Sequence, residues 1–389
     1  TEKSSEGVYS MQGAATCVDN STGNVVAIVG SRSQEDIKGY VLNRAYQSYR
    51  QPGSCIKPLN VYTPYLQLGN TPDTKVTDSQ IDGGPANADA SYAGEMTLTD
   101  AVKWSKNTVA WNIYQQITPK TGSSFLIKMG FHKIWVDKDY NAGALGGFTY
   151  GVTTEEMAGG YAALANDGVY RKATCIRLIV NASNKTVVNE TNRDSKVYDK
   201  SASRMMTQML REVVLSGTGT SANVENAVVA GKTGTTNASK DVWFCGYSKY
   251  YTTTVWAGYD YPKEMSGVNS RVNAIFKDFM TAVHTNLPVT DFSTVTQQTT
   301  QPETTAAVQE ETQSLPQETT AIVPEMETTG IEQVTPQQVP STTAQVPTTT
   351  PYQRWTTAPA QPKTTAPMQY GDIDATTRTD PDATARGEW

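Results

Sequence analysis

The sequence predicts a mixed α+β domain with one antiparallel sheet built from segments at its two ends and packed between helices. Strand-like apolar runs occur near the N-terminus and again between residues 224 and 259. Helical signals dominate between about 40 and 215. Strands at both ends with helices between them favour a single domain whose first and last strands share a sheet.

The first strands are AATCV and VVAIV, and the turn residues D-N-S-T-G-N separate them. Among the helices, the clearest begins at Thr153-x-x-Glu156, which predicts a capping box ahead of MAGGYAALAND. Gly168 suits the position just past the end of that helix.

The later strands are VENAVVAGKTGT, DVWFCGYS and TTTVWAGYD. A final helix follows, because apolar residues recur at helical spacing and predict one buried face. These residues are Val272, Ile275, Phe276, Phe279, Met280 and Val283.

Composition divides the chain into a folded region, 1–292, and a low-complexity tail, 293–389. The tail holds eleven of the 19 prolines and few aliphatic residues, so it cannot bury enough apolar surface to offset its ordering entropy. It is predicted to be an extended spacer or surface brush, or more simply a linker. Twelve acidic against four basic residues give the tail a net charge of −8, and the chain carries −6, so residues 1–292 carry +2. No nucleic-acid partner is indicated.

Neither a membrane span nor a metal site is predicted. No run of eighteen apolar residues occurs, and the chain lacks an initiator Met, so it resembles a piece of a longer protein with any anchor upstream. Cys17, Cys55, Cys175 and Cys245 show no metal-ligand spacing. Buried thiols are expected, and one disulfide stays open as an alternative.

The stretch QPGSCIKP places Ser54 and Lys57 three residues apart. Pro52-Gly53 resists helix and Pro58 fits only a first helical turn, so both side chains belong to an opening turn and lie on one face. Serine is a weak nucleophile until a base takes its proton, and a desolvated lysine could do so. For an isolated pair, a helix cap and a surface charge would be the simpler interpretation.

Two further motifs change that balance. Ser105-Lys106-Asn107 and Lys232-Thr233-Gly234-Thr235 follow in order, and S-x-x-K, S-x-N, K-T-G is the signature of penicillin-recognising serine acyltransferases. A second K-T-G begins at Lys120, but Pro119 before it and a helix cap expected at Ser123 or Ser124 indicate a helix start. A second S-x-N at Ser221 falls in a Gly-rich loop.

From Gln12 to Tyr259 the chain resembles the transpeptidase domain of class A penicillin-binding proteins, which implies a β-lactamase/transpeptidase-like fold. The similarity is carried by NRAYQSYRQPGSCIKPLNVYTPYL, SKNTVAWNIY, GALGGFTYGVTTEEMAGGYAALANDGVY, LSGTGTSA and VAGKTGTTNASKDVWFCGYS. Cys55 and Lys106 are departures at variable positions within two of the motifs.

The resemblance implies a role for each motif residue. Ser54 would attack the carbonyl between the terminal D-alanines of a peptidoglycan stem peptide, with Lys57 as general base and Ser105 and Lys232 relaying the proton. The N–H groups of Ser54 and Thr235 would form the oxyanion hole. Gly234 would let the substrate backbone approach. Lys232, Thr233 and Thr235 suit the substrate carboxylate, and Asn107 suits a substrate backbone group.

The same resemblance implies that β-lactam antibiotics acylate Ser54 and that no metal or cofactor is used. It also implies an upstream membrane anchor and glycosyltransferase domain, a place on the extracytoplasmic face of the bacterial membrane, and cell-wall, divisome or elongasome proteins as partners.

Two alternatives remain: a serine β-lactamase and a non-catalytic penicillin-sensing domain. A β-lactamase needs a deacylating base, but the capping box explains Glu155-Glu156 more simply. A Ser-His-Asp triad is disfavoured, since the two histidines, His132 and His284, are expected at the surface or core edge. Trp104 and Trp111 are expected in the core, and substrate lining by Trp104 is the lesser alternative.

Overall fold

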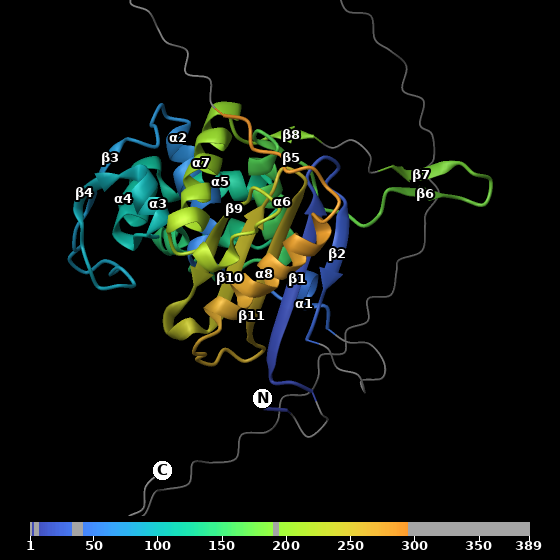
Figure 1. The fold of residues 1–389 in the computed structure, drawn as a ribbon, viewed down its shortest axis with the longest axis horizontal. Coiled ribbons are helices and arrows are strands. Elements are labelled where there is room, and N and C mark those ends of the chain that lie inside the picture. Colours follow the sequence, from blue (N-terminus) through green and yellow to red (C-terminus); the bar gives the residue numbers. More distant parts are fainter. Residues whose placement is uncertain (1, 4–7, 33–41, 190–193, 295–389) are drawn as a thin grey trace, which may run out of the picture. The chain divides into compact units, whose positions relative to one another are not determined.

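The main sheet has five antiparallel strands in the order β2-β1-β11-β10-β9 (Figure 1). The computed structural model describes residues 2–3, 8–32, 42–189 and 194–294. In it β1 pairs with β11 from Met11 opposite Tyr259 to Asp19 opposite Tyr251, so segments from both ends of the folded region meet in one sheet, as predicted. The strands are β1 (Met11–Asp19), β2 (Val25–Val29), β9 (Ala230–Thr235), β10 (Asp241–Tyr247) and β11 (Tyr251–Tyr259).

The predicted turn between the first two strands is fixed by a carboxylate. Asp19 Oδ1 accepts hydrogen bonds from the backbone N–H groups of Ser21 at 2.9 Å and Thr22 at 3.0 Å. Gly23 completes the reversal at φ +75°, a left-handed conformation that glycine adopts without a Cβ penalty.

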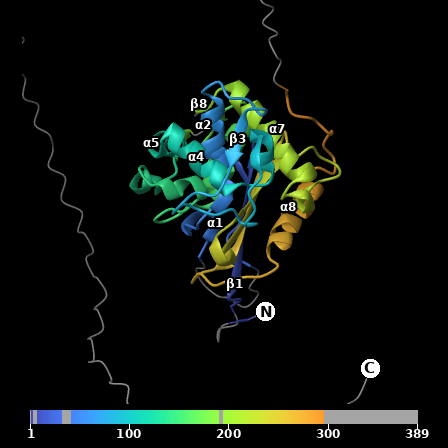
Figure 2. The ribbon, with the colours of Figure 1, turned by 90° about the vertical axis from the view of Figure 1, so that its left-hand side faces the viewer.

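Helices cover both faces of the sheet. α6 packs on β1 and β11 and α7 on β9, and most of their buried apolar residues belong to the main core, whereas α8 packs on β10 and β11 over a second core cluster. Figure 2 shows α4 and α8 on opposite sides of the strands. A separate apolar cluster under α8 includes Phe244, Val255 and Phe276. The main α-helices are α3 (Leu98–Lys103), α4 (Asn107–Ile117), α5 (Pro119–Lys128), α6 (Thr154–Ala165), α7 (Lys200–Ser216) and α8 (Asn269–Val283).

The capping box of α6 forms as predicted. Thr153 Oγ1 accepts from Glu156 N–H at 3.1 Å, and Glu156 Oε2 accepts from Thr153 N–H at 2.9 Å. α8 also forms, but its predicted apolar face is wrong at Ile275, which is 52% exposed. A helical stripe alone does not show how far the sheet reaches beneath it.

Short elements that the sequence did not predict complete the fold. The hairpin of β3 (Lys75–Asp78) and β4 (Gly94–Thr97) carries the segment 79–93, and two further pairs, β5 with β8 and β6 with β7, lie outside the main sheet (Figure 1). Their bounds, with the remaining short helices, are β5 (Val169–Tyr170), β6 (Leu178–Val180), β7 (Thr186–Asn189), β8 (Ser195–Lys196), α1 (Arg44–Gln47), η3 (Ile134–Asp137), η4 (Asn141–Leu145), η5 (Thr220–Ala222) and η6 (Asn237–Ser239).

Several residue-level expectations are corrected. His284 is buried, because Nδ1 bonds the Met280 carbonyl and Nε2 bonds Ser248 Oγ. Cys175 is exposed, whereas the other three thiols are buried and all four are free. Trp104 is 49% exposed and so is no core aromatic, although Trp111 packs against the main core.

No helix in the described part of the chain is long and apolar enough to cross a membrane. The predicted tail, 293–389, lies outside the described residues except for its first two.

Candidate active site

The Ser54 segment enters a helical stretch of three short pieces. They are a 3₁₀ turn, η1 (Gly53–Ile56), a π-helical turn, η2 (Pro58–Tyr62), and α2 (Thr63–Leu66). Gly53 opens the stretch at φ +51°, and Pro58 stands where it removes no helical hydrogen bond. Ser54 and Lys57 therefore lie in the opening turn, with Ser54 half-buried and Lys57 fully buried.

This turn packs directly against β9, one of the two edge strands of the sheet. A Cβ on Gly53 would come within 2.8 Å of the Thr235 carbonyl oxygen, and a Cβ on Gly234 would lie 2.4 Å from the Pro52 carbonyl oxygen. Gly234 is thus required by contact between the strand and the turn. Its missing side chain would point into the protein, so this contact accounts for the glycine, and the approach of a substrate backbone to Gly234 stays a prediction.

Additional hydrogen bonds hold the turn in place. Cys55 Sγ donates to the Lys232 carbonyl at 3.1 Å, and Tyr161 OH donates to the Cys55 carbonyl at 2.6 Å. Trp243 Nε1, on β10, donates to the Gln51 carbonyl at 2.8 Å. Every one of these bonds is long-range in sequence, so the turn that carries Ser54 is held in place by the assembled sheet and α6.

The Lys57 amine is surrounded by acceptors from the second motif. Its Nζ donates to Asn107 Oδ1 at 2.7 Å and to the Ser105 carbonyl at 2.9 Å, with the Lys106 carbonyl at 3.4 Å. The two shortest of these bonds tie the amine to the backbone of Ser105 and to the Asn107 side chain. In the described residues no hydrogen bond joins Lys57 Nζ to the Ser54 hydroxyl.

Burial, and then the nearby charge of Lys232, lower the pKa of Lys57 well below the ordinary value for lysine. Both effects disfavour the ammonium form. Lowering the pKa increases the fraction of neutral Lys57 amine, the form that can accept a proton.

Ser105 occupies a strained position at the junction of α3 and α4. Its φ of +60° is a left-handed conformation that non-glycine residues adopt at a cost of about 1–3 kcal/mol. The bend directs the Ser105 carbonyl to Lys57 Nζ and its hydroxyl to Lys232 Nζ. One residue thus contacts both lysines through different atoms.

Lys232 projects from β9 into the same buried region. Its Nζ donates to Ser105 Oγ at 2.9 Å and to the Thr233 carbonyl at 3.0 Å. Burial lowers the pKa of Lys232 to about 8, while the Cys55 and Cys245 thiols act weakly in the opposite direction. Near neutral pH the Lys232 ammonium is therefore the retained positive charge of the site.

The threonine hydroxyls of the third motif lie on the open side of β9. Thr233 Oγ1 is 2.7 Å from Thr218 Oγ1, and Thr235 Oγ1 donates to Asn269 Oδ1 at 3.2 Å. Thr233 is half-buried and Thr235 exposed. Both hydroxyls are therefore accessible on the edge strand that also carries the buried Lys232.

The second K-T-G, at Lys120, and the second S-x-N, at Ser221, lie in other elements of the fold. Lys120 stands in the first turn of α5, whose cap is Thr118 Oγ1, accepting from Thr121 N–H at 3.3 Å, so the cap expected at Ser123 or Ser124 is wrong. Ser221 lies in a 3₁₀ turn and accepts a hydrogen bond from Asn273 Nδ2.

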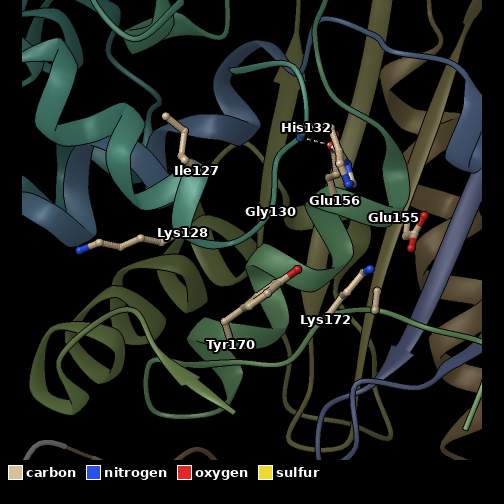
Figure 3. A pocket seen from close by; sticks show the side chains of 9 residues that line it. Ile127, Lys128, Gly130, His132, Glu155, Glu156, Tyr170 and Lys172 are labelled. Atoms are coloured by element: carbon tan, nitrogen blue, oxygen red, sulfur yellow. Dashed lines mark hydrogen bonds and ion pairs between the residues drawn. The ribbon is translucent and has the colours of Figure 1, made fainter. Parts of the chain in front are cut away.

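His132, Glu155 and Glu156 also lie away from the motif residues. They line a cavity of about 260 Å³ between the end of α5, the start of α6 and β5 (Figure 3). His132 Nδ1 is 3.0 Å from Glu156 Oε1, and the same carboxylate caps α6. None of the three motifs contributes to this cavity.

Sequence reasoning missed Asn87 and Asp78, which contact the second motif from the β3–β4 hairpin. Asn87 Oδ1 accepts from Asn107 N–H at 2.7 Å, and Asp78 Oδ2 lies 3.3 Å from Lys106 Nζ. Polar residues in a short strand and its loop carry no periodic signal. The only sequence indication was a lysine inside the second motif, without a visible partner.

The family described as the penicillin binding protein transpeptidase domain matches residues 13–281. Penicillin-binding protein 4 of Bacillus subtilis is 34% identical over 265 residues, which are 67% of this chain and 42% of that protein. Penicillin-binding protein 1A of Clostridium perfringens is 32% identical over 305 residues, 74% of this chain and 45% of that protein. The chain thus spans less than half the length of these relatives.

Solved structures share the fold. Penicillin-binding protein 1A from Haemophilus influenzae aligns with a TM-score of 0.60 and 24% identity, covering 75% of this chain and 51% of that one. The PonA1 protein from Mycobacterium tuberculosis, solved in complex with penicillin V, aligns with a TM-score of 0.63 and 22% identity, covering 73% and 81%.

Proposed function

The chain belongs to the transpeptidase domains of class A penicillin-binding proteins, and from this membership we propose that it cross-links peptidoglycan stem peptides through a serine acyl-enzyme at Ser54. One observation supports the assignment of the site. Three motifs separated by up to 178 positions meet around two fully buried lysines that share Ser105. β-Lactams, which resemble the D-alanyl-D-alanine end, are proposed to acylate the same serine.

In the acylation step, Ser54 Oγ forms a bond to the carbonyl carbon between the two D-alanines, and its proton passes to Lys57 Nζ. The C–N bond breaks, and the leaving amine takes a proton from Ser105 Oγ. Lys232, 2.9 Å away, restores the Ser105 hydroxyl. The step begins with Lys232 charged and Lys57 neutral and ends with Lys57 charged and Lys232 neutral, so the acyl-enzyme keeps a single ammonium in the buried pair.

The acceptor amine of a second stem peptide then attacks the ester. Its proton returns through Ser105 to Lys232, and Ser54 Oγ recovers a proton from Lys57 as it leaves. Water in place of the amine gives carboxypeptidase activity by the same route. The scheme uses no metal and no organic cofactor.

The N–H groups of Ser54 and Thr235 are proposed as the oxyanion hole. The close approach of Gly53 to the Thr235 backbone supports this, because it brings the two segments together beside the nucleophile. Losing one such donor typically costs about 10²- to 10³-fold in rate. Lys232, with Thr233 and Thr235, is proposed to bind the substrate carboxylate.

Asn107 is proposed to contribute through its bond to Lys57. Its Oδ1 accepts from Lys57 Nζ and its Nδ2 donates to the Ala86 carbonyl, so both ends of the amide are engaged. This supports a role in orienting the base more directly than binding of a substrate backbone group.

The same site would also serve a β-lactamase, and the lifetime of the acyl-enzyme separates the two. Glu156, the acid considered as a deacylating base, caps α6 away from the motif residues, which supports the synthase. We expect a penicilloyl adduct to persist for hours. Deacylation within seconds would instead assign a hydrolase, and a failure to release D-alanine from a stem peptide would favour a sensor.

We propose further that the folded domain is 1–292, that 293–389 is a linker or spacer, and that the domain works on the extracytoplasmic face of the bacterial membrane. We propose that the parent protein also has an anchor and a glycosyltransferase domain. Its proposed partners are proteins of cell-wall synthesis, such as divisome or elongasome proteins. The greater length of the relatives supports further domains in the parent protein.

Covalent labelling with a fluorescent penicillin tests the function. The wild-type chain should be labelled and Ser54→Ala should not, at nearly unchanged thermal stability. Labelling of Ser54→Ala at the wild-type rate would show that another serine is the nucleophile.

A further inference from the structure

The helix that carries Asn107 has no capping side chain of its own. Lys106 is the N-cap residue of α4 and makes no side-chain cap bond. The acceptor comes instead from the hairpin segment 79–93, where Asn87 Oδ1 accepts from Asn107 N–H at 2.7 Å and from Thr108 N–H at 3.3 Å. A residue twenty positions upstream therefore satisfies the first N–H groups of the helix.

Asn87 is itself held by a buried carboxylate. Its Nδ2 donates to Asp78 Oδ1 at 2.6 Å and to the Ser91 carbonyl at 2.8 Å. Asp78 Oδ1 also accepts from Thr108 Oγ1 at 2.5 Å, and Oδ2 from Ala93 N–H at 2.9 Å. Asp78 is 1% exposed, so its contacts leave Asn87 one orientation with the carbonyl oxygen toward α4.

Lys106 closes the network from the other side. Its Nζ lies 3.3 Å from Asp78 Oδ2 and donates to Asp89 Oδ2 at 3.0 Å and to the Ser91 carbonyl at 3.1 Å. Burial alone would lower the pKa of Lys106, but its bonds to Asp89 and Asp78 raise it. The ammonium thus remains charged and ties 78, 89 and 91 to the start of α4.

The segment also fixes the Asn107 side chain. The Ala86 carbonyl accepts from Asn107 Nδ2 at 2.9 Å, which forces Asn107 Oδ1 toward Lys57 Nζ. The reversed amide would place Nδ2 against the N–H groups of Lys57, donor against donor. Asn87 and Ala86 therefore determine which atom the amine of Lys57 meets.

We propose that Asn87 and Lys106 are positioning residues that hold Asn107 and the Ser105 bend so that Lys57 is oriented as the base for Ser54. This inference rests on the proposed function. Asn87 acts through Asn107, and Lys106 acts through Asp78 and Asp89. Neither needs to contact the substrate.

The test measures penicillin acylation by rapid mixing, which separates the dissociation constant of the initial complex from the acylation rate constant k2. Asn87→Ala should lower k2 by about 10²-fold, the size of effect expected when reacting groups are misplaced by about 1 Å, and leave the dissociation constant nearly unchanged. A purely structural role would lower thermal stability without changing k2 of the folded fraction.

Thr118→Ala is the matched control, because it removes a helix cap from the adjacent helix α5. It should cost similar stability and leave k2 at the wild-type value. Equal losses of k2 in Thr118→Ala and Asn87→Ala would overturn the proposal, since any destabilised variant would then behave alike.

Lys106 supplies a second, conservative comparison. Lys106→Arg keeps a charged donor for Asp78 and Asp89 and should retain k2 within about threefold, whereas Lys106→Met leaves Asp78 without its cation and should lose about tenfold or more. Wild-type k2 in both Asn87→Ala and Lys106→Met would overturn the proposal and leave the function intact. A wild-type chain not acylated at Ser54 would remove the proposed function, and this inference with it.

Discussion

Lys232 Nζ donates a hydrogen bond to Ser105 Oγ at 2.9 Å, across 127 positions of sequence. The Ser105 backbone carbonyl accepts from Lys57 Nζ. A single residue, bent into a left-handed conformation, therefore links the two buried amines. Charge on one lysine disfavours charge on the other, which matches a mechanism that moves one proton between them.

Mutation can distinguish Lys57, the lysine of the S-x-x-K motif, from Lys120, the lysine of the second K-T-G. Lys57→Ala should lower the rate of penicillin acylation by at least about 10²-fold, because the proposed base is lost. Lys120→Ala, in the first turn of α5, should be labelled at the wild-type rate. Gel fluorescence after timed exposure to labelled penicillin measures both, and slow labelling of Lys120→Ala would reverse the motif assignment.

The pH dependence of acylation should fall on its alkaline side near pH 8. Burial lowers the pKa of Lys232 to about 8, so above that pH the ammonium proposed to bind the substrate carboxylate loses its proton. On the acid side the rate should rise with pH as Lys57, whose pKa is lowered by burial and by Lys232, becomes neutral. The second-order rate constant for acylation, measured from pH 5 to 10, reports both limbs.

Lys232→Arg tests the assignment of the alkaline limb. A guanidinium does not lose its proton in this range, so the variant should be slower at pH 7 yet show no decline above pH 8. An unchanged alkaline limb in Lys232→Arg would assign it to another group.

Gly234→Ala should disrupt the contact between β9 and the turn that carries Ser54. Its Cβ would lie 2.4 Å from the Pro52 carbonyl and 2.8 Å from Cys55 Sγ, so we expect a loss of about 1–3 kcal/mol in the free energy of unfolding together with slower acylation. Gly13→Ala, on β1, is the milder comparison and should cost less stability, because its nearest atom, the Trp256 carbonyl oxygen, is 3.3 Å away. Urea unfolding measures stability, and a fully stable Gly234→Ala would contradict the contact.

The capping box of α6 should matter for stability but not for chemistry. Thr153→Ala removes the bond from Glu156 N–H and should cost about 1 kcal/mol. Glu156→Gln should leave the lifetime of the penicilloyl adduct unchanged, since Glu156 caps α6 and contacts His132 instead of the motif residues. A markedly longer adduct lifetime in Glu156→Gln would show that this acid drives deacylation.

Much of the fold could be predicted from the sequence because local patterns and burial agree. The strand runs at both ends, the Asp19 turn and the Thr153–Glu156 box are local signals, and each forms as predicted. Ile275, Trp104 and His284 were misplaced, since exposure depends on which elements pack over a residue. The β3–β4 hairpin was missed because its strands are short and mostly polar.

By itself, the sequence determined the order and chemistry of the motifs: a hydroxyl at Ser54, amines at Lys57 and Lys232, and the Ser105–Asn107 pair. Only the tertiary structure decided the pKa shifts of the two lysines and the contacts that hold the motif residues in place. A lysine pKa depends on burial and on charges that folding brings near. Gly234 serves a backbone contact, and Asn87 and Asp78 hold the start of α4. Such long-range contacts leave no periodic trace in a sequence, since they are set by packing between elements.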